Sequence, residues 1–516
     1  MECLIFLKQI FLSLLSWCII VPLSLLGFIY RAIIAVILKR RFKGKYGGLV
    51  TKQDTLFHSS PFVDVAYISA VLYIKADHQI DLQKEIWKII QEKVFDNPEN
   101  YPKLTSSVHT FGGFIYYIKN NVQISEVLKT YEVPCDVSLT EEYVKEVLGK
   151  VIDWGCLSKN SALWEIHVVP RPLDDKSPDG LYRYVMILRA HHSLGDGISL
   201  MTLLVQLFGD APTQNFSYDL YDKLFKDRYA PKITKNMFIP AAVKMWRNLL
   251  NILEMFFISP GRIIQIEHLQ PKDQNQWRNS QFSGEKYVAW SKECKTECFP
   301  MVKSIKNSTD TKVSSVLITA IYESILAYCE RTSLAEPKDF SAFMTIRTKP
   351  PFMENLKPVP LENYTSYALL NFPTELKSES ALKNLKVLTQ ETFSKIRTSD
   401  VLFAIQMMEY LIGYMPIFLV DQLLRMDNGT FIISIVPGGS PIKILDGCIL
   451  EHIVPLLPLL HGFSIAFAVV TYDDRLQVSV VADKNVIRSS KELQKIADDV
   501  LHFIKVIDSE SKDTIF

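Results

Sequence analysis

The sequence His191-His192-Ser193-Leu194-Gly195-Asp196-Gly197 follows a run of β-branched, aliphatic and aromatic residues at 182–190. The turn-forming stretch 177–180 precedes that run, so the pattern predicts a strand. The apolar residues 198–208 after the motif predict a mostly buried helix. The two histidines are therefore expected on a loop between a strand and a helix, where side chains can reach a cleft. Imidazole is the side chain best suited to proton transfer near neutral pH.

A second strand is expected at 163–169, immediately upstream of the motif. The loop 170–180 would join it to the strand at 182–190 as an antiparallel pair. This part of the chain therefore predicts an α+β domain with mainly antiparallel pairing.

The C-terminal part of the chain alternates predicted helices and strands. Residues 313–329 predict a helix, and 463–471 and 476–481 predict a hairpin. A final helix is expected to begin at a capping box, Ser489-Ser490-Lys491-Glu492, and to cover the sheet that contains the hairpin. Its apolar face comprises Leu493, Ile496, Ala497, Val500, Leu501 and Ile504.

Composition excludes some classes of function. The chain has 516 residues, 48% of them hydrophobic, which suffices for two domains and a membrane element. The formal net charge is +1, so the cationic field typical of nucleic-acid binding is missing and no nucleic-acid partner is expected. The close pair Cys294 and Cys298 has no second pair or histidine cluster at zinc-ligand spacing, so no metal is expected.

The N-terminus predicts a membrane anchor at 1–45. Residues 10–30 are almost all apolar and 32–38 continue the pattern, which is longer than the core of a signal peptide. Basic residues follow this run while Lys8 alone precedes it, so the positive-inside rule places the later domains in the cytosol. Pro22 leaves a bent hairpin open, and a cleaved secretory leader is the alternative to an anchor. The basic residues are Lys39, Arg40, Arg41, Lys43 and Lys45.

Residues 237–258 predict a helix that lies at a membrane interface or links domains. An ordinary helix with its apolar face on the core is the alternative. The polar stretch 272–285 indicates a domain boundary. The sequence therefore divides into an anchor at 1–45, a first domain at 46–226, an apolar linker region at 227–285 and a second domain at 286–516.

The motif at 191–197 resembles the His-His-x-x-x-Asp-Gly motif of the wax ester synthase/diacylglycerol acyltransferase family. Residues 53–57 resemble the family's Asp-x-x-Phe element, and 162–165 resemble its Pro-Leu-Trp-Glu strand. The remaining similar segments follow in the family's order at 345–347, 362–364, 436–439, 446–447, 471–472 and 482–483.

Some positions depart from the family's pattern. Ser314-Ser315 replaces a common Asn-Asp, Ile435 replaces an Asn, and Glu362 replaces a Gly. These departures leave the substrate preference open, although the histidine motif is complete. Bacterial members typically lack an N-terminal anchor of this kind.

The resemblance implies two chloramphenicol-acetyltransferase-like sandwich domains with a central active-site tunnel, a fold shared with condensation domains. It implies transfer of a long-chain acyl group from acyl-CoA, a co-substrate, to a fatty alcohol or diacylglycerol, with no cofactor. Another acceptor, such as a sterol, small alcohol or amine, and a non-catalytic lipid-binding role are the alternatives. The apolar run 401–424 would border an acyl tunnel, touch the membrane or form a buried helix pair. The endoplasmic reticulum is the expected membrane, with lipid droplet and plasma membrane as alternatives.

The resemblance also assigns roles to the motif. His192 would be the general base that takes a proton from the attacking alcohol, which contributes about 10²–10⁴-fold to the rate. Its imidazolium would then protonate the departing CoA thiolate. His191 is expected to orient or pack, and a purely structural His-His turn is the alternative to both roles.

The other candidate residues surround this motif. Asp196 is expected to fix the loop through an ion pair, with Arg347 as its candidate partner, or to cap the following helix. Gly197 permits a tight turn. Three further residues are expected either to line the cleft and stabilise an oxyanion or to form plain turns: Asn363, Pro437 and Gly438.

Overall fold

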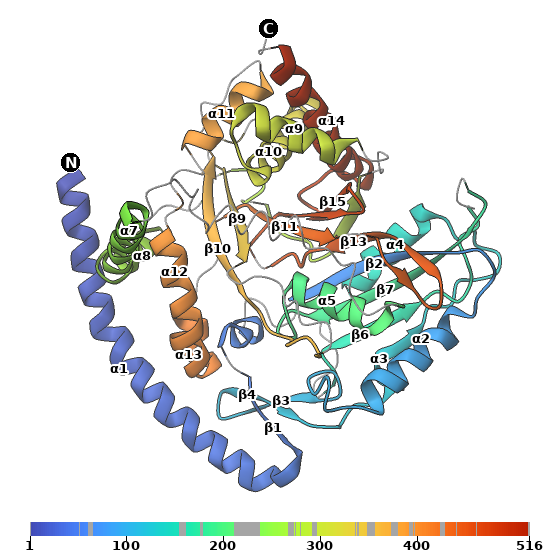
Figure 1. The fold of residues 1–516 in the computed structure, drawn as a ribbon, viewed down its shortest axis with the longest axis horizontal. Helices are drawn as coiled ribbons and strands as arrows, with labels where there is room; N and C mark the ends of the chain where they lie inside the picture. The colour runs from blue at the N-terminus through green and yellow to red at the C-terminus, as the bar shows by residue number, and fades with distance from the viewer. Residues whose placement is uncertain are drawn as a thin grey trace.

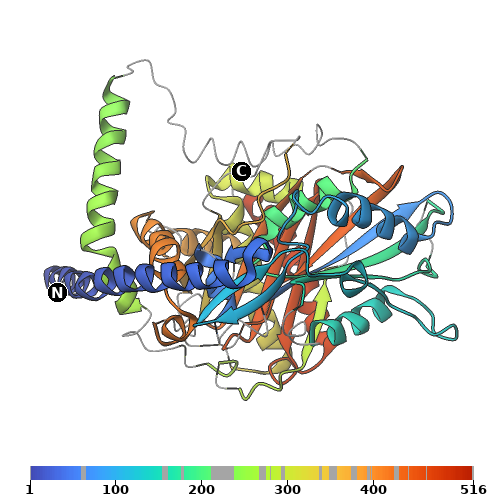
Figure 2. The same cartoon turned by 90° about the horizontal axis from the view of Figure 1, so that it is seen from below.

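The computed structural model has two six-stranded sheets, a small third sheet and helices around them (Figures 1 and 2). It describes residues 2–50, 52–59, 66–153, 161–175, 179–210, 238–266, 273, 275–278, 280–291, 297–335, 337, 340–347, 357–372, 380–391, 396, 398–423, 429–439, 441–460 and 462–513. The described α-helices are α1 Glu2–Phe42, α2 Leu82–Ile90, α3 Ile124–Val127, α4 Glu141–Asp153, α5 Gly197–Phe208, α7 Phe238–Phe257, α8 Ser259–Ile264, α9 Cys298–Thr309, α10 Val313–Thr332, α11 Ala381–Glu391, α12 Thr398–Gln406, α13 Ile417–Leu423 and α14 Ser490–Asp513.

The first sheet has the strand order β12-β13-β2-β7-β6-β5. These strands are β2 Tyr67–Ala76, β5 Leu128–Thr130, β6 Trp164–Val168, β7 Tyr182–His191, β12 Lys443–Ile444 and β13 Cys448–Leu456. The predicted antiparallel pair is present as β6 and β7. Strand β13 comes from the C-terminal part of the chain and pairs with β2, placing Ile449 opposite Lys75. The first sheet is thus built from both halves of the sequence.

Alternate side chains of β2 enter two different cores, as the period of a strand requires. Leu72 and Ile74 belong to a cluster under α2 and α5, whereas Val71 and Tyr73 face the opposite way. Because both faces of the sheet are covered, the middle of its central strands, 70–74 in β2 and 184–188 in β7, is apolar without alternation.

The second sheet has the order β10-β9-β11-β14-β15-β8. Its strands are β8 Lys286–Trp290, β9 Phe340–Arg347, β10 Thr365–Phe372, β11 Phe431–Gly439, β14 Ile465–Tyr472 and β15 Arg475–Asp483. The predicted hairpin is β14 and β15. Helix α14 begins as predicted, with the Glu492 amide donating to Ser489 Oγ at 3.2 Å, and its buried face covers this sheet.

The two sheets meet through one shared core. Val185 and Ile187 of the first sheet lie in the same cluster as Phe343 and Ile432 of the second, with α4 beside them. The opposite face of the second sheet packs on α9, α10, α11 and α14. This layering brings the two halves of the chain together around the end of β7.

Residues 436–439 correct a prediction made from the Pro-Gly-Gly pattern. They are the end of β11, not a turn, and Pro437 pairs in parallel with Thr471. On the side of β11 that faces β9, the described pairing ends at residue 433. A proline, which lacks a backbone N–H, is therefore tolerated at 437 because no β9 residue needs that donor. Gly438 is required here because a Cβ would lie 2.7 Å from the Thr471 carbonyl oxygen.

Helix α1 lies along the flank of the molecule and continues through Pro22 without a break, so the hairpin is not observed (Figure 1). It packs on a third sheet made of β1 Tyr46–Leu49, β3 Ser107–Phe111 and β4 Phe114–Ile118, and on α8. Ser13 Oγ accepts a hydrogen bond from the Gly261 amide at 2.9 Å, and Arg31 donates to the Val50 carbonyl at 2.9 Å. The arginine that interrupts the apolar run therefore points into the protein.

The outward face of α1 is apolar. Its buried positions include Ser13 and Ser16, whereas large apolar side chains are exposed. The exposed set includes Leu4, Leu7, Phe11, Leu14, Leu15, Ile19, Leu25, Leu26, Phe28, Ile29, Ile33 and Val36. A helix on a water-facing surface buries its apolar side chains and exposes its polar ones, and α1 does the opposite.

Helix α7 exposes a similar set over its described side chains: Met245, Trp246, Leu249, Leu250, Ile252, Leu253, Phe256 and Phe257. The alternative of an ordinary core-facing helix at 237–258 is therefore wrong for these residues. Among the described residues, two helices are long and apolar enough to cross a membrane, but α10 is buried in the second core, which leaves α1 as the candidate anchor.

The predicted apolar run from 401 lies between α1 and the first half of the chain. It forms α12, the irregular turns Met407–Leu411 and Ile412–Tyr414, and α13. Met408, Leu411 and Met415 pack with Leu56, which belongs to the short helix Lys52–His58. The end of the run at 424 lies outside the described residues.

Candidate active site

The histidine loop is held by its flanking elements. His191 ends β7, and Asp196 caps α5 by accepting the Ser199 amide hydrogen bond at 2.9 Å. The His192 amide donates to the Ala66 carbonyl at 2.7 Å. His192 is partly exposed, whereas its neighbours on the loop are buried. His192 is therefore the residue of the turn 191–196 that keeps some accessible surface.

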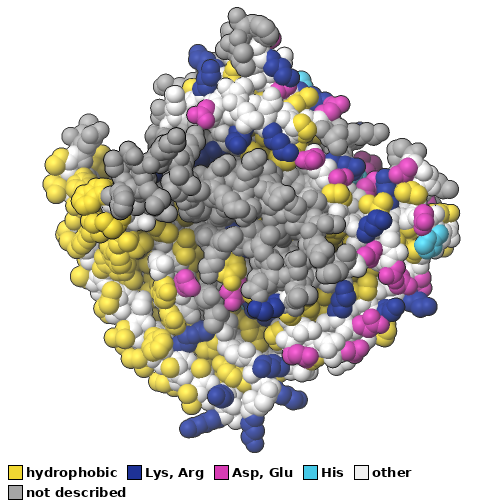
Figure 3. All heavy atoms as spheres, in the orientation of Figure 1, with side chains coloured by type: hydrophobic (Ala, Val, Ile, Leu, Met, Phe, Trp, Pro, Cys, Tyr) yellow, Lys and Arg dark blue, Asp and Glu magenta, His cyan; other side chains and the backbone are white. Residues whose placement is uncertain are grey.

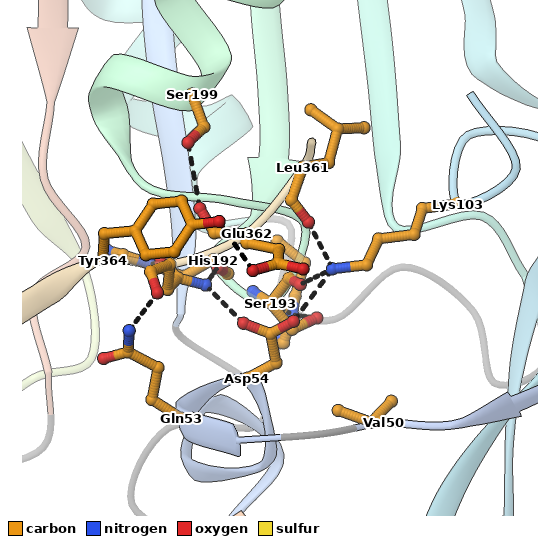
Figure 4. A network of polar contacts seen from close by, with 12 residues as sticks. Val50, Gln53, Asp54, Lys103, His192, Ser193, Ser199, Leu361, Glu362 and Tyr364 are labelled. Carbon is orange, nitrogen blue, oxygen red and sulfur yellow. Dashed lines mark hydrogen bonds and ion pairs between the residues drawn. The ribbon is translucent and has the colours of Figure 1, made fainter. Parts of the chain in front are cut away.

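Asn363, from the second half of the chain, fixes the His192 ring. Figure 4 shows the network of polar contacts around this ring, with His192, Asp54 and Lys103 labelled. His192 Nδ1 lies 2.9 Å from Asn363 Oδ1. The Asn363 amide nitrogen donates to Asp54 Oδ1 at 2.9 Å and to the His192 carbonyl at 2.7 Å. Both of those partners accept hydrogen bonds, so the amide oxygen must face the ring.

This orientation determines the tautomer of His192. An amide oxygen only accepts hydrogen bonds, so Nδ1 carries the ring hydrogen and donates it to Asn363. In the neutral ring, Nε2 then has a free lone pair. The Phe57 ring stacks on the imidazole with centroids 4.0 Å apart and limits its movement.

Lys103 belongs to the same network (Figure 4). Its ammonium group donates to Asp54 Oδ2 at 2.8 Å and to the carbonyls of Ser193, at 3.3 Å, and Leu361, at 2.5 Å. Burial raises the pKa of Asp54, and the Lys103 charge opposes that rise. Lys103 thus connects the histidine loop to the segment that carries Asn363.

Burial also sets the protonation of the two histidines. It lowers the pKa of His192 below its ordinary value, against contributions from Asp196 and Asn363 that raise it. Burial lowers the pKa of His191 further, and the neighbouring rings of His58 and His192 add to this because a second positive charge beside them would be repelled. Both rings are therefore neutral at pH 7, and His192 can accept a proton.

The structure contains the ion pair expected for Asp196. Arg347 Nη1 lies 2.5 Å from Asp196 Oδ1, and both side chains are buried. Asp196 Oδ2 accepts the Tyr364 amide at 2.9 Å, in addition to the cap on Ser199. The Asp196 carboxylate thus accepts the backbone amides of Ser199 and Tyr364 and pairs with the Arg347 guanidinium. These three contacts are the pattern of a structural group rather than an acid or base.

His191 is fully enclosed by its neighbours. Its Nδ1 lies 2.7 Å from Ser193 Oγ, and its ring stacks on His58 with centroids 4.6 Å apart. The edge of the ring meets Tyr67. These contacts suit the orienting and packing role expected from the sequence.

Gly197 and β11 form another part of the site's surroundings. The end of β11 packs beside Gly197, where a Cβ would lie 3.5 Å from Val436 Cγ2, an ordinary van der Waals contact, so this packing does not by itself require a glycine. Pro437 and Gly438 continue that strand and pair with β14, and no contact between them and His192 is among the described interactions. Asn363 alone of the three expected cleft residues bonds directly to the histidine.

Sequence reasoning missed Lys103 and the buried pair of Glu165 and Arg189, whose side chains are 3.0 Å apart behind His191. A charged residue inside an otherwise apolar strand is a signal for such pairs. Lys103 has no such local signal. Within the described ranges, no group of three or more His, Cys, Asp or Glu side chains is arranged to hold a metal ion.

Sequence comparisons point to one family. A profile described as the WS/DGAT C-terminal domain matches residues 361–505. Wax ester synthase/diacylglycerol acyltransferase 11 of Arabidopsis thaliana is 21% identical over 442 residues, covering 79% of this chain and 85% of that protein. Wax ester synthase/diacylglycerol acyltransferase 5 of the same plant is 28% identical over 158 residues, covering 29% of this chain and 28% of that protein.

Solved structures confirm the predicted fold class. The wax ester synthase/diacylglycerol acyltransferase from Marinobacter aquaeolei VT8 superposes with a TM-score of 0.58 at 14% identity, over 90% of this chain and 99% of that one. The first condensation domain of the CDA synthetase gives 0.54 at 12% identity, over 90% and 97%. The chain thus has the two-domain fold of chloramphenicol acetyltransferase and condensation domains.

Proposed function

Because this chain is a homologue of the wax ester synthase/diacylglycerol acyltransferases, as its motifs predicted, we propose that it is an acyl-CoA-dependent O-acyltransferase. It transfers a long-chain acyl group to a lipid alcohol, either a fatty alcohol or diacylglycerol. The observation that carries this proposal is the bond from His192 Nδ1 to Asn363 Oδ1, which supports a base with Nε2 free.

The proposed reaction has two proton transfers and no covalent enzyme intermediate. His192 Nε2 takes the hydroxyl proton as the alcohol oxygen attacks the thioester carbonyl carbon. The tetrahedral intermediate then collapses, the carbon–sulfur bond breaks, and the imidazolium gives its proton to the CoA thiolate. Ester and free CoA leave, and His192 is again neutral.

Attachment to a membrane is the second part of the proposal. Helix α1 has 41 residues and is therefore about 60 Å long, roughly twice the thickness of a hydrocarbon core. Its exposed apolar face and that of α7 lie on one flank, where Figure 3 shows the largest hydrophobic area of this view. Both helices would contact the lipid phase in which the acceptor dissolves, with the catalytic halves on the cytosolic side of the endoplasmic reticulum.

The test is product analysis of membranes that contain wild-type protein, His192→Ala or His502→Ala. They receive labelled long-chain acyl-CoA with either hexadecanol or diacylglycerol. We expect ester from the wild type and from His502→Ala, whose histidine is exposed on α14, and a loss of about 10²-fold or more in His192→Ala. If folded wild-type protein esterifies neither acceptor, the proposed substrates are wrong.

A further inference from the structure

A cavity of about 400 Å³ lies between α1 and the segment 403–420. Leu12, Ser16 and Ile20 of α1 form one wall, and Ile263 and Ala404 contribute to the walls beside it. We propose that this cavity binds the aliphatic tail of the lipid-alcohol acceptor, which enters from the membrane beside α1. This inference rests on the proposed function and adds a site for one of its two substrates.

The lining has the chemistry of a hydrocarbon site. None of the described residues that line the cavity is charged. The Ser16 hydroxyl already donates to the Leu12 carbonyl at 2.6 Å, so it does not need a ligand partner. Met407, Met408 and Met415 supply flexible side chains that adapt to chains of different shape. The volume falls in the range of about 300–1,000 Å³ that is usual for small-molecule sites.

The cavity reaches toward the reacting histidine. Leu56 forms part of its wall, and the next residue, Phe57, stacks on His192 with ring centroids 4.0 Å apart. Leu56 and Phe57 pack with Met408 and Met415 in one cluster. A tail held in the cavity would therefore bring its hydroxyl end past Phe57 to the imidazole.

The cavity also reaches the flank of the molecule. Leu15 and Ile19 line it and are nevertheless 49% and 51% exposed. Both belong to the outward apolar face of α1, which forms part of the hydrophobic area in Figure 3. An alcohol dissolved in the bilayer could thus enter without crossing water.

The cavity beside α1 suits the lipid alcohol, the acyl acceptor, better than acyl-CoA, the acyl donor. Coenzyme A has a large, charged nucleotide head, and the described residues of the cavity wall include no cation to bind it. A fatty alcohol or diacylglycerol has a small uncharged head and remains in the membrane. The lipid-facing helix is therefore the expected route for the acceptor tail.

The first experiment narrows the cavity with Leu15→Trp and uses Leu14→Trp as a matched control. Leu14 is the adjacent leucine, is 50% exposed and is not part of the lining. We expect Leu15→Trp to raise the KM for hexadecanol about tenfold while leaving the KM for octanol and for acyl-CoA unchanged. Leu14→Trp should match the wild type. Equal KM values for hexadecanol in the two variants, or a rise in the KM for acyl-CoA alone, would overturn the proposal.

Because Leu15 lies at the rim of the cavity, a second variant fills the cavity from the side of α12. Like Leu15→Trp, Ala404→Phe is expected to raise the KM for hexadecanol relative to the KM for octanol. Thermal unfolding checks that this variant is folded. If the folded variant keeps the wild-type preference, the acceptor tail lies elsewhere.

A binding readout separates this inference from the proposed function. A long-chain alcohol that carries a diazirine in mid-chain is photolysed with full-length protein in lipid nanodiscs, and labelled peptides are identified by mass spectrometry. We expect labels within 12–20 and 403–415 in the wild type and in His192→Ala, and fewer in Leu15→Trp. If wild-type protein is labelled in these segments but forms no ester, the proposed function is refuted and the tail site is retained. Ester formation with labels elsewhere, or labelling of these segments only by a diazirine acyl-CoA, would refute the tail site.

Discussion

Asn363 holds His192 across the boundary between the two halves of the fold, with 2.9 Å between Oδ1 of the amide and Nδ1 of the ring. The proposed base comes from the first half and the group that orients it comes from the second. The proposed mechanism therefore requires the two halves to be correctly assembled.

Replacing Asn363 tests that dependence. Asn363→Ala removes the acceptor for Nδ1–H and leaves Asp54 without its amide donor. We expect kcat to fall by about 10–100-fold, with a smaller change in KM, because orientation is lost while the base remains. Steady-state kinetics on folded protein measure this. A kcat equal to that of the wild type would refute the positioning role.

The pH profile follows from the pKa of His192. Burial lowers that pKa below 6.5, and a base must be neutral, so kcat/KM should rise with pH to a plateau with a midpoint below 6.5. The bond to Asn363 stabilises the charged ring and raises its pKa, so Asn363→Ala should move the midpoint to still lower pH. A midpoint at higher pH in Asn363→Ala than in the wild type would contradict this prediction.

The buried ion pair predicts a loss of stability. Arg347→Met leaves the Asp196 carboxylate without its guanidinium partner, which should cost about 3–5 kcal/mol. Thermal unfolding in detergent measures the change. Lys150→Ala breaks an exposed pair with Glu146 and should leave the Tm unchanged. Equal Tm values for the two variants would mean that the buried pair contributes no more than the exposed one.

Membrane attachment can be weakened on the outward face of α1. Leu25 and Leu26 are 60% and 63% exposed, and a charge at such a position costs about 2.5–3.5 kcal/mol in a bilayer centre. The double variant Leu25→Glu, Leu26→Glu should float less with liposomes than the wild type. Trp87→Glu is the control, because Trp87 is an exposed apolar residue of α2 on the opposite side of the molecule (Figure 1). Equal flotation of all three proteins would exclude α1 as the attachment surface.

Local patterns predict much of the fold. The strand that ends at His191, the hairpin of β14 and β15, and the start of α14 each carry their signal within a few residues of sequence. These signals are alternation, turn residues and a cap, and they do not depend on distant parts of the chain.

The remaining features depend on long-range contacts. The proline and glycines at 436–439 are typical of a turn, and only the parallel pairing with β14 explains why they form a strand end. Lys103 lies in an unremarkable polar segment and gains its role from three acceptors, one of which is the Leu361 carbonyl in the other half. The Asn363 side chain is part of a family motif, but its bond to His192 is visible only in three dimensions.

The crossing of β13 into the first sheet affects how the protein can be made. During synthesis, β2 and β7 emerge long before residues 448–456, so the edge of β2 that later receives β13 has unpaired backbone groups until most of the chain has left the ribosome. Pairing across this sequence distance is intrinsically slow. The first half cannot complete its sheet by itself, so the edge of β2 is open to pairing with other chains until β13 arrives.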